Sequence, residues 1–91
     1  MLTLERTNQF KRDYKREKSG QHSDIDGELM EVLDLLQAGK RLPASRNDHP
    51  LKGQFKGYRD CHLKPDLVLI YKKSKTTIKL ARLGSHSELF G

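Results

Sequence analysis

Residues 58–83, YRDCHLKPDLVLIYKKSKTTIKLARL, decide the fold of this chain of 91 residues. Apolar and β-branched side chains gather there in three runs, and turn-forming residues separate the runs. The runs predict strands at 58–63, 67–72 and 76–83. A further strand is expected just upstream, at 52–56. Because the connections between these strands are short, antiparallel pairing is favoured.

The sequence on the N-terminal side of this segment predicts two helices. Thr7 is a suitable N-cap for a helix over about 8–19. Ser23 and Asp26 resemble a capping box that opens a second helix, which ends at Gly39. The second helix has an apolar stripe typical of packing on a core, made of Ile25, Leu29, Val32, Leu33 and Leu36.

The order of these elements predicts the fold class. Leu2 and Leu4 alternate with polar residues and indicate a short first strand, whereas residues 40–50, KRLPASRNDHP, indicate a loop. A strand, two helices and then several strands predict an α+β domain. We expect two N-terminal helices packed on a twisted antiparallel sheet of about four to five strands. The length predicts one domain, residues 1–91.

Cysteine content and hydropathy bear on where the protein works. The single cysteine, Cys61, excludes an intramolecular disulfide, and a free thiol is typical of the reducing cytoplasm. No apolar stretch approaches the length of about 18 residues that a membrane span needs. The start of the chain, MLTLERTNQF, lacks the apolar run of a signal peptide. We therefore expect a cytoplasmic protein without a membrane segment.

Positive charge is concentrated in the second half of the chain. The formal net charge is +6, of which residues 1–46 contribute +1 and residues 47–91 contribute +5. A concentrated positive surface attracts polyanions, above all nucleic acid. A surface that is merely solvated stays open as an alternative. The candidate phosphate contacts are Lys52, Lys56, Arg59, Lys72 and Lys73.

The same half carries residue types suited to acid–base chemistry. Three of the four histidines are there, and strand alternation places Asp60 and His62 on one face of the 58–63 strand. Metal-free RNA cleavage needs a base for the ribose 2′-OH, an acid for the leaving oxygen and cations for the phosphate. Histidine suits the proton roles and arginine the phosphate, while an aromatic ring can stack on a base.

Other sites are not expected. The histidines have no zinc-motif spacing and there is no cysteine pair, so we expect neither a metal site nor a cofactor. Cys61 lies on the opposite strand face from His62 and is expected in the core. His22, at the start of the second helix, is expected to have no catalytic role.

Four motifs occur in order along the second half of the chain. They are DHPLKG at 48–53, GYRDCH at 57–62, PDLVLIY at 65–71 and RLGSHSELFG at 82–91. With these motifs the whole chain resembles the YafQ branch of the RelE-like bacterial toxins, which are the toxin halves of type II toxin–antitoxin pairs. The resemblance implies a RelE/microbial-RNase-like fold. It also implies an endoribonuclease that cleaves mRNA in the aminoacyl site of the 70S ribosome and inhibits translation.

The resemblance also assigns roles to residues of this chain. The implied catalytic set is His49, Asp60, His62, Asp66, Arg82, His86 and Phe90. His86 is implied as the general acid and Arg82 as the phosphate ligand. The general base stays open among His49, His62 and Asp66. Leu67 and Phe55 stand where a close family member has Trp, which bears on base preference and ribosome affinity more than on cleavage.

The implied partners are a cognate antitoxin, the ribosome and mRNA. We expect the antitoxin to be acidic, partly disordered and DNA-binding, so that the toxin reaches operator DNA only through it. Two other functions remain open. One is a ParE-like gyrase inhibitor on the same fold, which has no need of the His and Asp residues. The other is a ribosome- or RNA-binding module without catalysis.

Overall fold

The computed structural model describes residues 1–91 as five strands, three α-helices and two 3₁₀ turns. The elements follow in the order β1 (Thr3–Arg6), α1 (Asn8–Ser19), α2 (Asp26–Gln37), η1 (Ala44–Arg46), β2 (His49–Pro50), η2 (Gly53–Phe55), β3 (Arg59–Lys64), β4 (Leu67–Lys73), β5 (Thr77–Gly84) and α3 (His86–Phe90). The predicted α+β class is therefore confirmed, as are the first helix and the three strands of the 58–83 segment.

The strands form one mixed sheet in the order β1-β5-β4-β3-β2. Strands β2 to β5 pair antiparallel, as predicted. Strand β1 departs from the expected all-antiparallel sheet because it pairs parallel with β5, Thr3 opposite Thr77. A parallel pair needs a long connection, and the helices and the three other strands supply it here.

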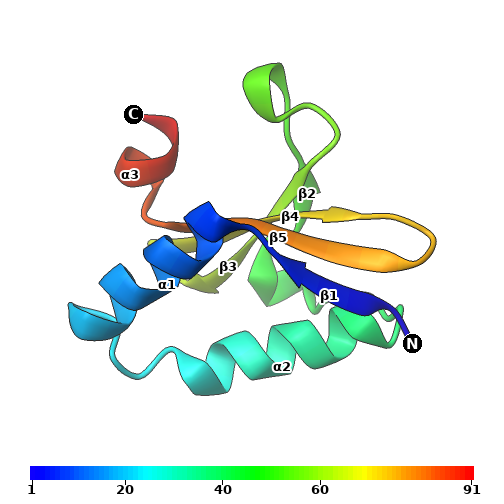
Figure 1. Ribbon diagram of the computed structural model, residues 1–91, viewed down its shortest axis with the longest axis horizontal. Helices are drawn as coiled ribbons and strands as arrows, with labels where there is room; N and C mark the ends of the chain where they lie inside the picture. Colours follow the sequence, from blue (N-terminus) through cyan, green and yellow to red (C-terminus); the bar gives the residue numbers. More distant parts are fainter.

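Helices α1 and α2 cover one face of the sheet, and Figure 1 shows α2 running beneath it. The main core lies between these two helices and the sheet. It consists of Phe10, Ile25, Leu29, Val32, Leu33, Leu36, Cys61, Leu63, Leu67, Leu69, Tyr71, Ile78, Leu80 and Leu83. Cys61 and the apolar stripe of α2 thus lie where the sequence predicted.

The opposite face of the sheet carries a second, smaller core. Val68 and Ile70 point there from β4 and pack with Leu89 of α3, while Phe55 of η2 adjoins them. In Figure 1, α3 and the loop after β2 rise on this side of the sheet. Since both faces are covered, β4 is apolar at successive positions instead of alternating.

The segment 52–56 is not a strand, contrary to prediction. It contains the 3₁₀ turn η2, and the chain bends sharply on both sides of it. Gly53 and Gly57 adopt positive φ angles of 66° and 93°, which an extended strand cannot contain. The strand that pairs with β3 is instead His49–Pro50, inside the segment predicted as a loop.

The start of α2 and the presence of α3 also differ from prediction. The capping box at Ser23 is wrong, since α2 begins at Asp26 after Ile25, which makes no side-chain cap. A capping box does occur at Ser85 and Glu88, where it opens the unpredicted helix α3. None of the three helices combines the length and apolar character needed to cross a membrane.

Candidate active site

Strand pairing gathers the predicted catalytic residues at one end of the sheet. Across β2, β3, β4 and β5, the directly paired residues His49, Asp60, Ile70 and Arg82 form one row. The next row runs from His62 through Val68 to Gly84. Because directly opposed residues share a face, Asp60 and His62 lie over the smaller core. Residues up to 33 positions apart in sequence thereby meet in two adjacent rows.

Asp60 is a buried acid in the centre of this group. Its side chain is 3% exposed, and His49 Nδ1 lies 2.9 Å from its Oδ1. The same Nδ1–H is directed at the carbonyl of Asn47, at 2.8 Å, so Asp60 Oδ1 accepts no aligned hydrogen bond. Burial raises the pKa of Asp60, although His49, His62 and His86 oppose the rise. Asp60 is thus a buried acid whose electrostatic neighbours are three histidines.

Two histidines and two phenylalanines form a ring cluster next to Asp60. The ring centroids of His62 and His86 lie 5.2 Å apart, and those of His86 and Phe90 lie 6.1 Å apart. Phe90 also meets Phe55 edge to face at 5.8 Å. Helix α3 thus places an imidazole and an aromatic ring, one turn apart, above the end of β3.

His86 is fixed by Asp66 in the turn between β3 and β4. Its Nδ1 lies 3.1 Å from Asp66 Oδ1, and its backbone N–H donates to the same oxygen at 3.4 Å. These bonds lower the pKa of Asp66, which is therefore a carboxylate and only accepts. Nδ1 must carry the proton of this bond. The other ring nitrogen, Nε2, is left free on a side chain that is 50% exposed.

Arg82 is held from outside the sheet. Its Nε donates to Oδ2 of Asp13, on α1, at 2.7 Å. The side chain of Arg82 is 26% exposed, whereas that of Asp13 is completely buried. Asp13 could not be predicted as this partner, because a charged residue in a charged helix resembles its solvated neighbours.

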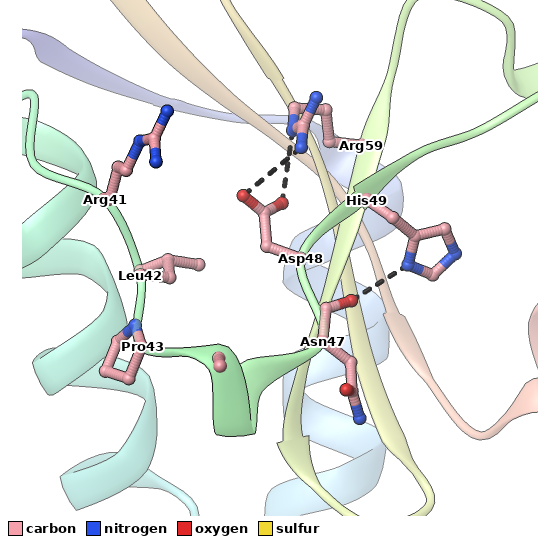
Figure 2. A pocket seen from close by; sticks show the side chains of 8 residues that line it. Arg41, Leu42, Pro43, Asn47, Asp48, His49 and Arg59 are labelled. Atoms are coloured by element: carbon pink, nitrogen blue, oxygen red, sulfur yellow. Dashed lines mark hydrogen bonds and ion pairs between the residues drawn. The ribbon is translucent and has the colours of Figure 1, made fainter.

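A cleft lies beside His49. Figure 2 shows Asp48 and Arg59 facing Arg41 across it. Arg59 Nε donates to Asp48 Oδ1 at 3.2 Å, and the hydroxyl of Tyr71 donates to the same oxygen at 2.6 Å. The guanidinium of Arg59, which is a predicted phosphate contact, is therefore held by Asp48, and Tyr71 of β4 holds Asp48 in turn.

The four lysines predicted to contact phosphate are all exposed. Lys52 and Lys56 flank η2, and Lys72 and Lys73 end β4. The ammonium group of Lys72 lies 5.4 Å from the ring centre of Tyr58. These positions leave the lysines free to meet a polyanion, and their RNA-binding role stays a prediction.

The two residues expected to have no catalytic role, His22 and Cys61, have other surroundings. His22 contacts Glu17 at 2.9 Å and is partly buried beside α1. The thiol of Cys61 is buried in the main core, which raises its pKa to about 12. Groups of three or more His, Cys, Asp or Glu side chains arranged to hold a metal ion are absent.

Comparison with known proteins places this chain in a family. Residues 2–91 match the family described as bacterial toxin of type II toxin–antitoxin system, YafQ. The chain belongs to the YafQ family. It is 38% identical over 88 residues to the mRNA interferase toxin YafQ of Escherichia coli K12, which covers 97% of this chain and 95% of that one. The expected resemblance is confirmed, and the chain is a toxin of a type II system.

Solved structures of similar toxins share the whole fold. The crystal structure of YafQ from E. coli BL21(DE3) has a TM-score of 0.91, 37% identity and full coverage of both chains. The E. coli DinJ–YafQ complex gives a TM-score of 0.88 at 38% identity, again with full coverage. A metal-bound toxin from Helicobacter pylori gives 0.84 at 45% identity, covering 99% of this chain and 100% of that one.

Proposed function

We propose that this YafQ-family toxin is an mRNA interferase that cuts mRNA in the aminoacyl site of the ribosome by acid–base catalysis. The observation that carries the proposal is the pair of imidazoles, His62 and His86, 5.2 Å apart beside a buried carboxylate and an anchored arginine. In the reaction, the 2′-oxygen bonds to phosphorus and the bond from phosphorus to the 5′-oxygen breaks. A base removes the proton of the 2′-OH, and an acid protonates the leaving 5′-oxygen.

His86 is suited to be the acid. Its Nδ1–H is held by the Asp66 carboxylate, so the ring is fixed with Nε2 free on a half-exposed side chain. When the ring carries both protons, its Nε2–H can pass one to the leaving oxygen. Asp66 is the less suitable base, because its lowered pKa makes it a weak proton acceptor.

His49 and His62 are the better candidates for the base. Nδ1 of His49 donates to the Asn47 carbonyl, so its Nε2 is free to accept a proton. Both rings lie around Asp60, whose negative charge stabilises whichever of them becomes protonated. Phe90 has an exposed face on which a splayed base can stack.

The partners follow from the charge of the surface. Exposed lysines around η2 and at the end of β4 favour ribosomal RNA, whose phosphates they neutralise. A cognate antitoxin would cover this basic surface with an acidic segment that folds on binding. The solved DinJ–YafQ complex of a relative supports such a partner.

Substitution of His86 tests the catalytic assignment. His86→Ala should abolish cut mRNA ends in toeprints of translating ribosomes and still bind ribosomes, because only the proton donor is lost. His22→Ala, which removes a histidine that is not in the candidate catalytic set and pairs with Glu17, is the matched control and should cleave normally. Full cleavage by His86→Ala would overturn the assignment. Stalling without cut ends by the unaltered toxin would indicate a binding module instead.

The requirement for the ribosome and for metal is tested in the same assay. We expect no cleavage of the same mRNA without ribosomes. Pretreatment of the toxin with EDTA, followed by its removal before ribosomes are added, should leave the rate unchanged because side chains supply every proton and charge. A rate lost with EDTA and restored by a divalent ion would contradict the metal-free mechanism. Inhibition of DNA supercoiling without cleavage would favour the gyrase-poison alternative.

A further inference from the structure

Asp13 is an acid in the middle of α1 with no exposed surface. A buried carboxylate is costly unless donors surround it. Here four residues donate to it, two from α1 and two from β5. They are Gln9 Nε2 at 3.0 Å, Arg16 Nη1 at 3.0 Å, the backbone N–H of Leu83 at 3.0 Å, and Arg82 through Nε at 2.7 Å and Nη2 at 3.3 Å.

The position of Asp13 follows from where β1 ends. Strand β1 accompanies β5 only as far as the pair Arg6–Leu80, so the edge of β5 beyond Leu80 has no strand partner. Helix α1 takes over this edge, as Figure 1 shows for its place beside β5. Thr7 Oγ1 donates to the Ala81 carbonyl at 2.9 Å, and Asp13 accepts from the N–H of Leu83. The carboxylate therefore replaces a missing strand.

The same carboxylate decides which edge of Arg82 is free. A guanidinium has five N–H groups in a rigid plane, and Asp13 occupies the Nε and Nη2 edge. The outer edge, formed by Nη1 and the second N–H of Nη2, stays available. That edge matches the two oxygens of a phosphate. Arg82 is in the same row as Asp60, two strands away.

We infer that Asp13 is a positioning residue, which clamps Arg82 so that its outer guanidinium edge faces the scissile phosphate. The inference rests on the proposed endoribonuclease function and adds to it a residue from the helical half of the chain. Without the clamp, Arg82 keeps its charge and loses its fixed rotamer. Its attraction for RNA then persists, while its alignment with the transition state is lost.

This separation of charge from alignment predicts a distinctive kinetic result. Asp13→Asn should lower kcat by about 10²-fold, the usual scale for a misplaced catalytic group. KM should stay unchanged or fall, because removal of a negative charge leaves Arg82 more attractive to phosphate. The matched control is Glu17→Gln, which alters another buried acid of α1 with no contact to Arg82. It should leave kcat unchanged.

A double-mutant cycle separates positioning from folding. If Asp13 acts through Arg82, Asp13→Asn should not slow the Arg82→Ala toxin any further. An equal slowing in both backgrounds would overturn the inference. Arg82→Lys keeps Asp13 and the positive charge but lacks the rigid fork, so it too should lose kcat. Full activity of Arg82→Lys would show that no fixed edge is needed, even if Asp13→Asn failed to fold.

A measurement without cleavage distinguishes failure of this inference from failure of the proposed function. In the free toxin, the Nε–H of Arg82 should give a resolved NMR signal that exchanges slowly with water. Rapid exchange in the unaltered protein would mean that no clamp exists, whatever the enzyme does. A slow signal in a toxin that cuts no mRNA would refute the proposed function and leave the clamp in place.

Discussion

Asp60 and Asp13 are two buried acids whose pKa values are shifted in opposite directions. Burial raises the pKa of Asp60 above its ordinary value of 3.8, because the imidazoles around it only partly offset the loss of water. Burial acts in the same direction on Asp13, but hydrogen bonds from Arg82 and Leu83 outweigh it and lower the pKa. The two residues should therefore affect stability oppositely as pH changes.

Asp60 should cost stability at neutral pH. The folded protein holds the Asp60 proton more tightly than the unfolded chain, so stability falls as pH rises from 3.8 through the raised pKa. Asp60→Asn should then raise the melting temperature at neutral pH, by about 4–8 °C for each kcal/mol gained. The gain should vanish below pH 3.8. Melting curves across this range check it, and an equal effect at every pH would contradict it.

Asp13→Asn provides the opposite case in the same experiment. Its lowered pKa contributes stability above pH 3.8, and this contribution is lost as pH falls through the folded-state pKa. The variant should melt lower than the unaltered toxin at neutral pH. The difference should shrink in acid. A variant that gained stability at neutral pH would show that the donors around Asp13 do not compensate for its burial.

At the scale of elements, the chain is closely packed at Gly84, where β5 meets α3. A Cβ at Gly84 would lie 3.0 Å from Arg16 Nη2, 3.2 Å from Glu88 Oε1 and 3.2 Å from Leu89 Cδ2. Arg16 also donates to the Leu83 carbonyl at 3.0 Å and pairs with Glu88 at 3.3 Å. Helix α1 therefore holds the helix that carries His86.

Gly84→Ala should disturb this join. We expect a loss of about 1–3 kcal/mol from overpacking, together with slower mRNA cleavage because α3 must move. Gly27→Ala is the matched control, since nothing lies within 4 Å of its added Cβ in α2. That variant should gain about 0.5–1 kcal/mol and cleave normally. Chemical denaturation and toeprinting measure both effects, and normal cleavage by Gly84→Ala would contradict the role given to the join.

The elements that sequence predicted well are those with local signals. Thr7 caps α1 through its own side chain, and the runs that became β3, β4 and β5 carry their apolar pattern within a few residues. The 52–56 segment was mistaken for a strand because its glycines act through backbone angles that apolar periodicity does not record. Helix α3 had a readable capping box at Ser85, but its five residues were too short for a periodic pattern.

The residue types of the candidate site could be predicted from the sequence, but the contacts between its side chains could not. Motifs located His49, Asp66 and His86, and alternation placed Asp60 beside His62. The contact of Asp13 with Arg82 spans 69 positions, and no local pattern reports such a pair. Whether these residues catalyse cleavage stays a prediction, which the His86 experiment tests.

At the scale of the whole molecule, the sheet separates the main core from the smaller core. Ile78 is completely buried in the main core, between the sheet and helices α1 and α2. Ile70 is completely buried in the smaller core on the opposite face, next to the candidate site. Ile70 also separates Asp60 from Arg82 in their row. The two isoleucines are a matched pair for asking which core supports catalysis.

Ile78→Ala and Ile70→Ala should each destabilise the fold by about 2–5 kcal/mol, the usual cost of a core cavity. Only Ile70→Ala should lower kcat at a temperature where both variants are folded, because its cavity lies in the row that holds Asp60 and Arg82. Denaturation curves and toeprinting on the same preparations check this. Equal kcat in the two variants would mean that the smaller core does not support the site.

The parallel pairing of β1 with β5 has a consequence for the order in which a nascent chain matures. Synthesis delivers Thr7 and Asp13 early, yet their partners Ala81 and Leu83 follow 74 and 70 positions later. Until then β1 has no neighbouring strand, and Asp13 lacks Arg82 and the N–H of Leu83. Closure of the sheet and anchoring of Arg82 therefore belong to one late event, and a chain still being translated carries His49 and His62 before Asp13 can hold Arg82.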